Sequence, residues 1–306
     1  MKYIEQLLKG NKPVNLWLYL PFPLFFVGLM FLNWIGTKML HQSTSEIIRA
    51  NIELYGKNIN FLMTVGPMIF MLLMLLAWVL GVQKQSFISL TTSRSKIDFK
   101  RIGVSFGIWS LCIIAMFIFQ YISNPGNFEF NLKFFPFLGF LVIAIILIPL
   151  QVAFEEYFLR GYLMQAIGLA SKSRFVALII TSLLFGLLHL ANPEVEKLGY
   201  SIMIYYIGAG FLLGIMTLMD EGIELALGFH AANNLIGALL VTSNWTAFQT
   251  NSIFLDLTPV EEGSSAADLL IQVGILFPLL LLLYSRIYKW NDWKSRLFGK
   301  VLTPKP

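Results

Sequence analysis

Three short segments of this sequence carry ionisable and amide side chains inside apolar stretches. Within each segment, the key residues are about one helical turn apart. They are, in chain order, Glu155-Glu156 with Arg160, Phe185 with His189, and His230 with Asn234. An ionisable residue inside a membrane span costs about 2.5–3.5 kcal/mol on insertion scales, so it is retained there for a structural or chemical reason. The joint occurrence of these residue types on three segments favours a functional site over unrelated packing residues.

The two adjacent glutamates are expected to have different roles. Glu156 and Arg160 are four residues apart, so they share one helix face and can pair. Such a pair reduces the cost of burying both charges. Glu155 lies about 100° round the helix and lacks that partner. We therefore expect Glu155 to act as a base, with Glu156 and Arg160 as supporting residues.

The first two segments are predicted to face each other at similar depth. A short turn near residues 168–174 joins them, so they should be antiparallel neighbours. Glu155 lies 15 residues before residue 170 and His189 lies 19 residues after it. At 1.5 Å of rise per residue, the two side chains lie within roughly 6 Å of each other along the helix axis.

This residue set could hydrolyse a peptide bond. A Glu beside a His can hold a water and deprotonate it, and a second His with an Asn can stabilise the oxyanion that forms. The predicted catalytic residues are Glu155, His189, His230 and Asn234.

Zinc is the alternative, because two imidazoles and one carboxylate form a known catalytic set. Here the ligands would be Glu155, His189 and His230. His230 lies 9 residues from the turn near residue 221, against 19 for His189 from its own turn. If the two turns are level, that difference predicts that the two histidines are separated in depth by about 15 Å. This separation favours metal-independent hydrolysis. The sequence leaves two alternatives for the cofactor, either zinc or no cofactor.

In order and spacing, the three segments resemble the EExxxR, FxxxH and HxxxN motifs of the CAAX prenyl protease type II family. This family is also called CPBP, and it includes bacteriocin-processing and Abi-like proteins. The resemblance covers roughly residues 140–240. It implies an intramembrane endopeptidase in which Glu155 and His189 activate the water and His230 and Asn234 form the oxyanion site. Glu156 and Arg160 would support them.

The resemblance also implies the partners. Members of the family are described both as metalloproteases and as metal-independent glutamate proteases. Eukaryotic members process prenylated C-termini, and some bacterial members act in bacteriocin maturation or immunity. We therefore expect contact with membrane lipid and a peptide or protein substrate, lipidated if the chain acts as the eukaryotic members do.

Composition places the whole chain in the membrane class. Hydrophobic residues make up 57% and charged residues 13%, against about 45–50% and about 25% in soluble domains. A spanning helix needs roughly 20 mostly apolar residues. Eight segments qualify: 14–36, 59–82, 102–123, 136–167, 174–193, 198–219, 223–242 and 267–287.

The sequence therefore predicts an all-α polytopic membrane protein, a bundle of about eight transmembrane helices. We expect a single membrane domain over residues 1–306, with the catalytic core at 140–240. The fourth segment is too long for one span and should tilt or extend beyond the hydrocarbon.

The loops predict the orientation. With the N-terminus inside, 17 of the 22 Lys and Arg residues fall in cytoplasmic segments, as the positive-inside rule requires. We expect both termini in the cytoplasm and, without a recognisable organelle signal, a bacterial cytoplasmic membrane. The turn at 220–224 fits poorly, because it would be cytoplasmic yet has no basic residue.

Two other classes of protein share some of these sequence features. A proton-coupled transporter also needs intramembrane Glu, His and Arg, but no inverted repeat or matching pair of broken spans is visible. A non-catalytic membrane immunity protein could keep the fold, although the three segments are intact.

The basic residues lie between and beyond the apolar segments, which excludes a nucleic-acid-binding interpretation. The single cysteine, Cys112, excludes an internal disulfide and a multi-cysteine metal site.

Overall fold

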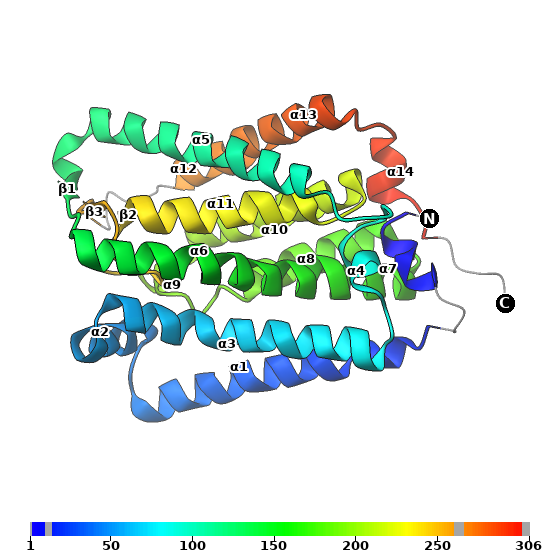
Figure 1. Cartoon of the computed structure of the whole chain (residues 1–306), viewed down its shortest axis with the longest axis horizontal. Coiled ribbons are helices and arrows are strands. Elements are labelled where there is room, and N and C mark those ends of the chain that lie inside the picture. The colour runs from blue at the N-terminus through cyan, green and yellow to red at the C-terminus, as the bar shows by residue number, and fades with distance from the viewer. Residues whose placement is uncertain (1, 10–13, 260–265, 302–306) are drawn as a thin grey trace.

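The computed structural model describes residues 2–9, 14–259 and 266–301. Helices dominate and run side by side along the molecule (Figure 1). Six helical segments in the described part of the chain are long and apolar enough to cross a membrane: Leu16–Thr37, Lys57–Val82, Phe99–Ser123, Phe134–Ser171, Pro193–Asp220 and Asp268–Tyr288. The protein is an all-α polytopic integral membrane protein, as predicted.

The predicted count of eight spans is not confirmed. The fifth predicted segment forms a helix of 14 residues, Arg174–Leu187. The seventh forms a helix of 17 residues, Glu224–Leu240. Both lie where a span was expected, and both are shorter than the roughly 20 residues that cross the hydrocarbon.

The elements have the following bounds. The α-helices are α1 Pro21–Leu40, α2 Thr44–Tyr55, α3 Lys57–Ala77, α4 Phe87–Thr91, α5 Phe99–Ser123, α6 Phe134–Glu156, α7 Met164–Ser171, α8 Arg174–Leu187, α9 Pro193–Leu198, α10 Met203–Asp220, α11 Glu224–Leu240, α12 Ala266–Ile271, α13 Phe277–Tyr288 and α14 Trp293–Phe298. The π-helical segments are η3 Trp78–Val82, η5 Tyr157–Leu163 and η8 Gln272–Leu276. The 3₁₀ segments are η1 Ile4–Lys9, η2 Leu16–Tyr19, η4 Pro125–Asn127 and η6 Gly199–Ile202. The strands are β1 Phe128–Phe130, β2 Val241–Thr242 and β3 Phe254–Asp256.

Helix α6 lies centrally in the bundle. It packs against α3 on one side and α11 on the other, while α11 also packs on α5 and α10 on α8. The strands form a small sheet of order β1-β3-β2, with β1 antiparallel and β2 parallel to β3. In Figure 1 this sheet lies at one end of the bundle and both chain termini lie at the other.

The segment that carries both glutamates is one long helix. Helix α6 continues through η5 into α7, so the helix runs for 38 residues from Phe134 to Ser171. This agrees with the expectation that the fourth segment exceeds a single flat span. The π-helical turn begins directly after Glu156, and such turns occur frequently at functional sites.

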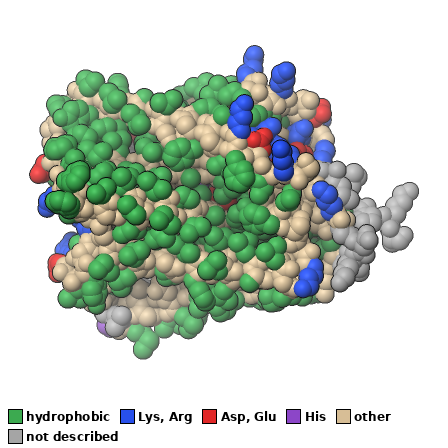
Figure 2. Space-filling view, in the orientation of Figure 1, with side chains coloured by type: hydrophobic (Ala, Val, Ile, Leu, Met, Phe, Trp, Pro, Cys, Tyr) green, Lys and Arg blue, Asp and Glu red, His purple; other side chains and the backbone are tan. Residues whose placement is uncertain are grey.

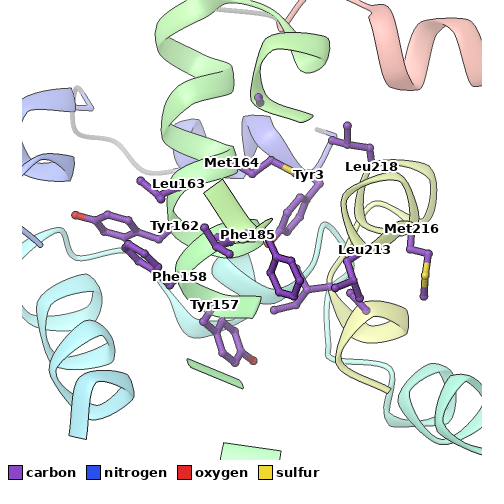
Figure 3. Close-up of a cluster of buried hydrophobic side chains, with 14 of the residues drawn as sticks. Tyr3, Tyr157, Phe158, Tyr162, Leu163, Met164, Phe185, Leu213, Met216 and Leu218 are labelled. Atoms are coloured by element: carbon purple, nitrogen blue, oxygen red, sulfur yellow. The ribbon is translucent and has the colours of Figure 1, made fainter. Parts of the chain in front are cut away.

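The apolar core gathers around that π-helical turn. Figure 3 shows Tyr157, Phe158 and Tyr162 of η5 among buried side chains that include Leu213 of α10. Tyr3, from the N-terminal segment, is fully buried in the same cluster. The core therefore draws on the N-terminal segment as well as on the central helices.

Two glycines allow α10 to approach α8 closely. A Cβ on Gly210 would collide with the backbone of Ser182, and one on Gly214 would collide with Leu178. Pairs of small residues four apart commonly let membrane helices pack at short range. The close approach brings the Gly210 carbonyl within reach of Arg160, as described below.

The acidic turn between α10 and α11 obtains its counterions from other segments. Arg94 contacts Asp220 at 2.8 Å and Glu224 at 3.2 Å. Further ion pairs join the turn to the starts of α5 and α8 and to α14: Arg101 with Asp220, and Arg174 and Arg296 with Glu221. The lack of basic residues in this turn is thus compensated by arginines that belong to segments predicted to be cytoplasmic.

Most Lys and Arg side chains visible in Figure 2 lie at the end of the molecule that carries the termini, and hydrophobic side chains cover most of the remaining face. We expect this basic end to face the cytoplasm.

In a Cys112→Ser background, cysteines would be placed at Lys96 and at Lys197, both exposed. A membrane-impermeant maleimide applied to intact cells should label Lys197→Cys only, and the reverse pattern would invert the orientation.

Candidate active site

A cavity of about 550 Å3 lies inside the bundle. Its walls combine apolar side chains of α1, α3 and α10 with polar groups of α6 and α11. The four predicted catalytic residues all line it: Glu155, His189, His230 and Asn234. A largely apolar pocket with a few convergent polar groups is typical of a binding or active site.

Glu156 joins two of the predicted residues at the back of the site. Its Oε1 accepts hydrogen bonds from Arg160 Nη1 at 3.1 Å and from His230 Nδ1 at 2.8 Å. The side chains of Glu156 and Arg160 are fully buried, which confirms the predicted pair. Arg160 also donates through Nη2 to the Gly210 carbonyl at 3.2 Å and lies 4.5 Å from the centroid of the Phe185 ring.

Glu155 occupies a different environment. Gln151 donates through Nε2 to Glu155 Oε1, and Gln151 Oε1 accepts from Asn234 Nδ2 at 3.0 Å. Glu155 Oε2 is buried and has no hydrogen-bond donor among the residues that the structure describes. The nearest imidazole nitrogen is His230 Nε2, 3.7 Å away. That separation is longer than a direct hydrogen bond and suits a bridging water.

His189 follows α8 rather than lying within it. Its Nδ1 is 2.7 Å from the carbonyl oxygen of Phe185. A carbonyl only accepts, so Nδ1 carries the proton and Nε2 is the acceptor in the neutral ring. The ring stacks on Tyr206 with centroids 4.4 Å apart, and this contact fixes its plane against the cavity wall.

The predicted depth of His230 is wrong. It was expected about 15 Å from the level of His189, yet it contacts both Glu155 and Glu156. The count assumed that the two turns are level. The turn after α7 is exposed at Ser171, whereas the turn before α11 is buried beneath the loop at 92–98. Helix α11 therefore begins deeper in the protein, and His230 reaches the glutamates after fewer residues.

The predicted partnership of Glu155 with His189 also changes. Within the described residues, His189 forms no ion pair with either glutamate, whereas His230 reaches both. The helix of the fifth segment ends at Leu187, so the even helical rise assumed for that segment stops two residues before His189. Both histidines still line the cavity, but His230 is the one beside Glu155.

Sequence reasoning missed Gln151 and Asn233. Gln151 stands four residues before Glu155 in an apolar run, and that spacing could have revealed it. Asn233 accepts from Trp109 Nε1 at 3.2 Å and Tyr205 OH at 3.1 Å, and its Nδ2 donates to Asn234 Oδ1 at 3.2 Å. The chain of amides from Asn233 to Gln151 orients the Glu155 carboxylate.

The proposed zinc ligands do not fit a metal site in this arrangement. Among the described residues, no group of three or more His, Cys, Asp and Glu side chains could hold a metal ion. The chemistry of this site is therefore assigned to its own side chains.

Comparisons with known proteins agree with the motif-based recognition. Residues 135–236 match the family described as type II CAAX prenyl endopeptidase Rce1-like. An uncharacterized protein of Bacillus subtilis (strain 168), YyaK, is 35% identical over 162 residues. The match covers 52% of this chain and 54% of YyaK, so the chain spans about half the length of that relative. No solved structure matches the chain.

Replacing Glu156 by glutamine should destabilise the bundle. The change leaves the buried Arg160 without an anionic partner, and losing one member of a buried ion pair costs about 3–5 kcal/mol. We expect Glu156→Gln to unfold at a clearly lower temperature than the wild type in detergent. Glu53→Gln, at an exposed position of α2, serves as the control. Equal melting temperatures for all three proteins would contradict the supporting role of Glu156.

Proposed function

We propose that this chain, whose central segment is Rce1-like, is an intramembrane peptidase that hydrolyses a peptide bond with a water activated by Glu155. The observation that carries the proposal is the buried, unpaired Oε2 of Glu155, which lies 3.7 Å from His230 Nε2 on the wall of the cavity. The family match supports a CAAX-type intramembrane protease at the level of the family.

The water would be held by two acceptors. His230 Nδ1 donates to Glu156, so the neutral ring presents the lone pair of Nε2. Glu155 Oε2 is the second acceptor, and together they can bind the two O–H groups of one water. The oxygen of that water is then free to attack a carbonyl carbon, while Glu155 takes one proton. When the C–N bond breaks, Glu155 returns the proton to the leaving amine.

Asn234 and His189 would bind the substrate. Asn234 uses one Nδ2 hydrogen for Gln151, and the second can stabilise the oxyanion. His189 presents Nε2, which accepts a substrate N–H when neutral and donates when protonated. Compared with the sequence-based assignment, His230 and His189 exchange roles, because His230 is the imidazole next to Glu155.

The substrate class follows from the setting. The cavity lies within a membrane bundle, so we propose a peptide or protein segment that reaches it at the membrane. CAAX-type C-terminal processing and bacteriocin-related maturation both fit this description. We also propose a single membrane domain over residues 1–306, with its core at 140–240, in a bacterial cytoplasmic membrane. The relative from Bacillus subtilis supports the bacterial setting.

Glu155→Gln should abolish cleavage and leave the fold intact, because it removes the base and almost no volume. Removing a general base typically costs about 10²–10⁴-fold in rate. Proteomics of membrane-protein termini would compare cells that carry the wild type, Glu155→Gln, or the exposed control Glu129→Gln. New termini should appear with the wild type and the control only. Identical termini in all strains would argue against a peptidase and favour a transporter or an immunity protein.

Zinc removal gives an independent test of the mechanism. We expect active purified protein to contain no stoichiometric zinc, and its activity to survive phenanthroline. The physical reason is that, among the described residues, no three His, Cys, Asp or Glu side chains are placed to hold one metal ion. Zinc at one equivalent, whose removal abolishes activity and whose return restores it, would move Glu155, His189 and His230 into ligand roles.

A further inference from the structure

A second carboxylate, Glu194, lines the same cavity as Glu155. It lies in the first turn of α9, opposite the segment 246–248 that also forms part of the wall. Its Oε1 accepts a hydrogen bond from the backbone N–H of Ala247 at 2.9 Å. Its Oε2 is buried and has no hydrogen-bond donor among the described residues.

No cation accompanies this carboxylate. In residues 2–9, 14–259 and 266–301, no Lys, Arg or His forms an ion pair with Glu194, whereas Glu156, Asp220 and Glu224 each have at least one. A carboxylate that is buried without a partner is costly, and such groups call for an explanation. The unused oxygen of Glu194 is available to whatever occupies the cavity.

The wall beside Glu194 leads to the catalytic cluster. Asn192, two residues earlier, donates through Nδ2 to Tyr206 OH at 3.5 Å. Tyr206 in turn stacks on His189. Glu194 is therefore connected to the proposed substrate-binding histidine by a short polar and aromatic surface. An aromatic face can also contact a cationic group.

We infer that Glu194 is a substrate-binding residue that selects peptides carrying a cationic group, either a Lys or Arg side chain or a free amino group. The cation would pair with Glu194 Oε2 while the scissile bond lies against Glu155. This inference rests on the proposed function, because it takes the occupant of the cavity to be a peptide. It adds a preference for positive charge that the catalytic cluster alone does not supply.

A purely structural role for Glu194 makes a different prediction. Within the described part of the chain, its one hydrogen bond to another residue uses Oε1 to hold the backbone of Ala247. A glutamine at position 194 retains that acceptor oxygen and removes the charge. Glu194→Gln therefore preserves the structural contact and tests the charge alone.

The experiment measures peptide binding separately from turnover. Pairs of fluorescein-labelled, end-capped hydrophobic decapeptides would differ at one position, lysine in one and norleucine in the other, with that position scanned along the peptide. Binding would be followed by anisotropy with protein in nanodiscs, in a Glu155→Gln background that prevents cleavage. We expect the lysine peptide to bind about tenfold more tightly at one or two positions, as for a poorly solvated charge pair.

Glu194→Gln should lose that preference and bind both peptides like the norleucine form. The matched control is Glu196→Gln on the same short helix, because the Glu196 carboxylate is exposed, contacts Ser45 and does not line the cavity. The control should keep the preference. Equal binding of both peptides at every position, or a preference that survives Glu194→Gln, would overturn the inference.

A turnover assay on the same peptides, with Glu155 intact, distinguishes the two proposals. Absence of cleavage together with a lysine preference that depends on Glu194 would contradict the peptidase and leave the cation site standing. Equal cleavage of the lysine and norleucine peptides, in protein that also binds both equally, would support the peptidase and contradict the cation site.

Discussion

The site depends on one buried oxygen, Oε1 of Glu156, which receives hydrogen bonds from Arg160 and from His230. Through Arg160 it is connected to the Gly210 carbonyl of α10 and to the Phe185 ring of α8, and through His230 to α11. Four helical segments thus converge on a charge that cannot be solvated by water. Because removing either partner of a buried ion pair is costly, these contacts constrain the relative arrangement of the helices. The cavity forms beside that arrangement, and Glu155 faces it.

Local spacing predicted part of this site well. The pairing of Glu156 with Arg160 and the separate environment of Glu155 follow from helical geometry within one segment, where 3.6 residues per turn leaves little freedom. The prediction of the depth of His230 failed because that depth depends on where a turn lies. Arg94 holds the turn at 220–224 inside the protein. Gln151 was overlooked because a lone amide in an apolar run has no charge to signal its cost. The all-α membrane class was predictable from composition. The end of α8 was not, since the apolar residues Leu188 and Leu190 follow the point where that helix ends.

The arginines at the basic end have two physical functions. Positive residues near span ends set the orientation of a membrane protein, yet Arg94 and Arg174 are also committed to carboxylates of the turn between α10 and α11. The same contacts position the start of α11 and therefore set the depth of His230 in the bundle. Arginines that count toward the predicted orientation thus also hold the start of the helix that carries His230. A sequence-level count of basic residues cannot reveal this second function, because it treats each loop as independent.

Three carboxylates near or in the cavity occupy three environments, and the environments separate their chemistry. Glu156 is held at Oε1 by a guanidinium and an imidazole, and it does not line the cavity. Glu155 is held at one oxygen by an amide, which orients it without neutralising its charge, and its other oxygen stays available to take a proton. Glu194 is held at one oxygen by a backbone N–H and has no cationic partner in the described chain, which suits it to attract a cation. Of the three, Glu155 combines an unpaired oxygen and an adjacent imidazole with a place on the cavity wall. This combination is why we propose proton transfer for Glu155 and cation binding for Glu194.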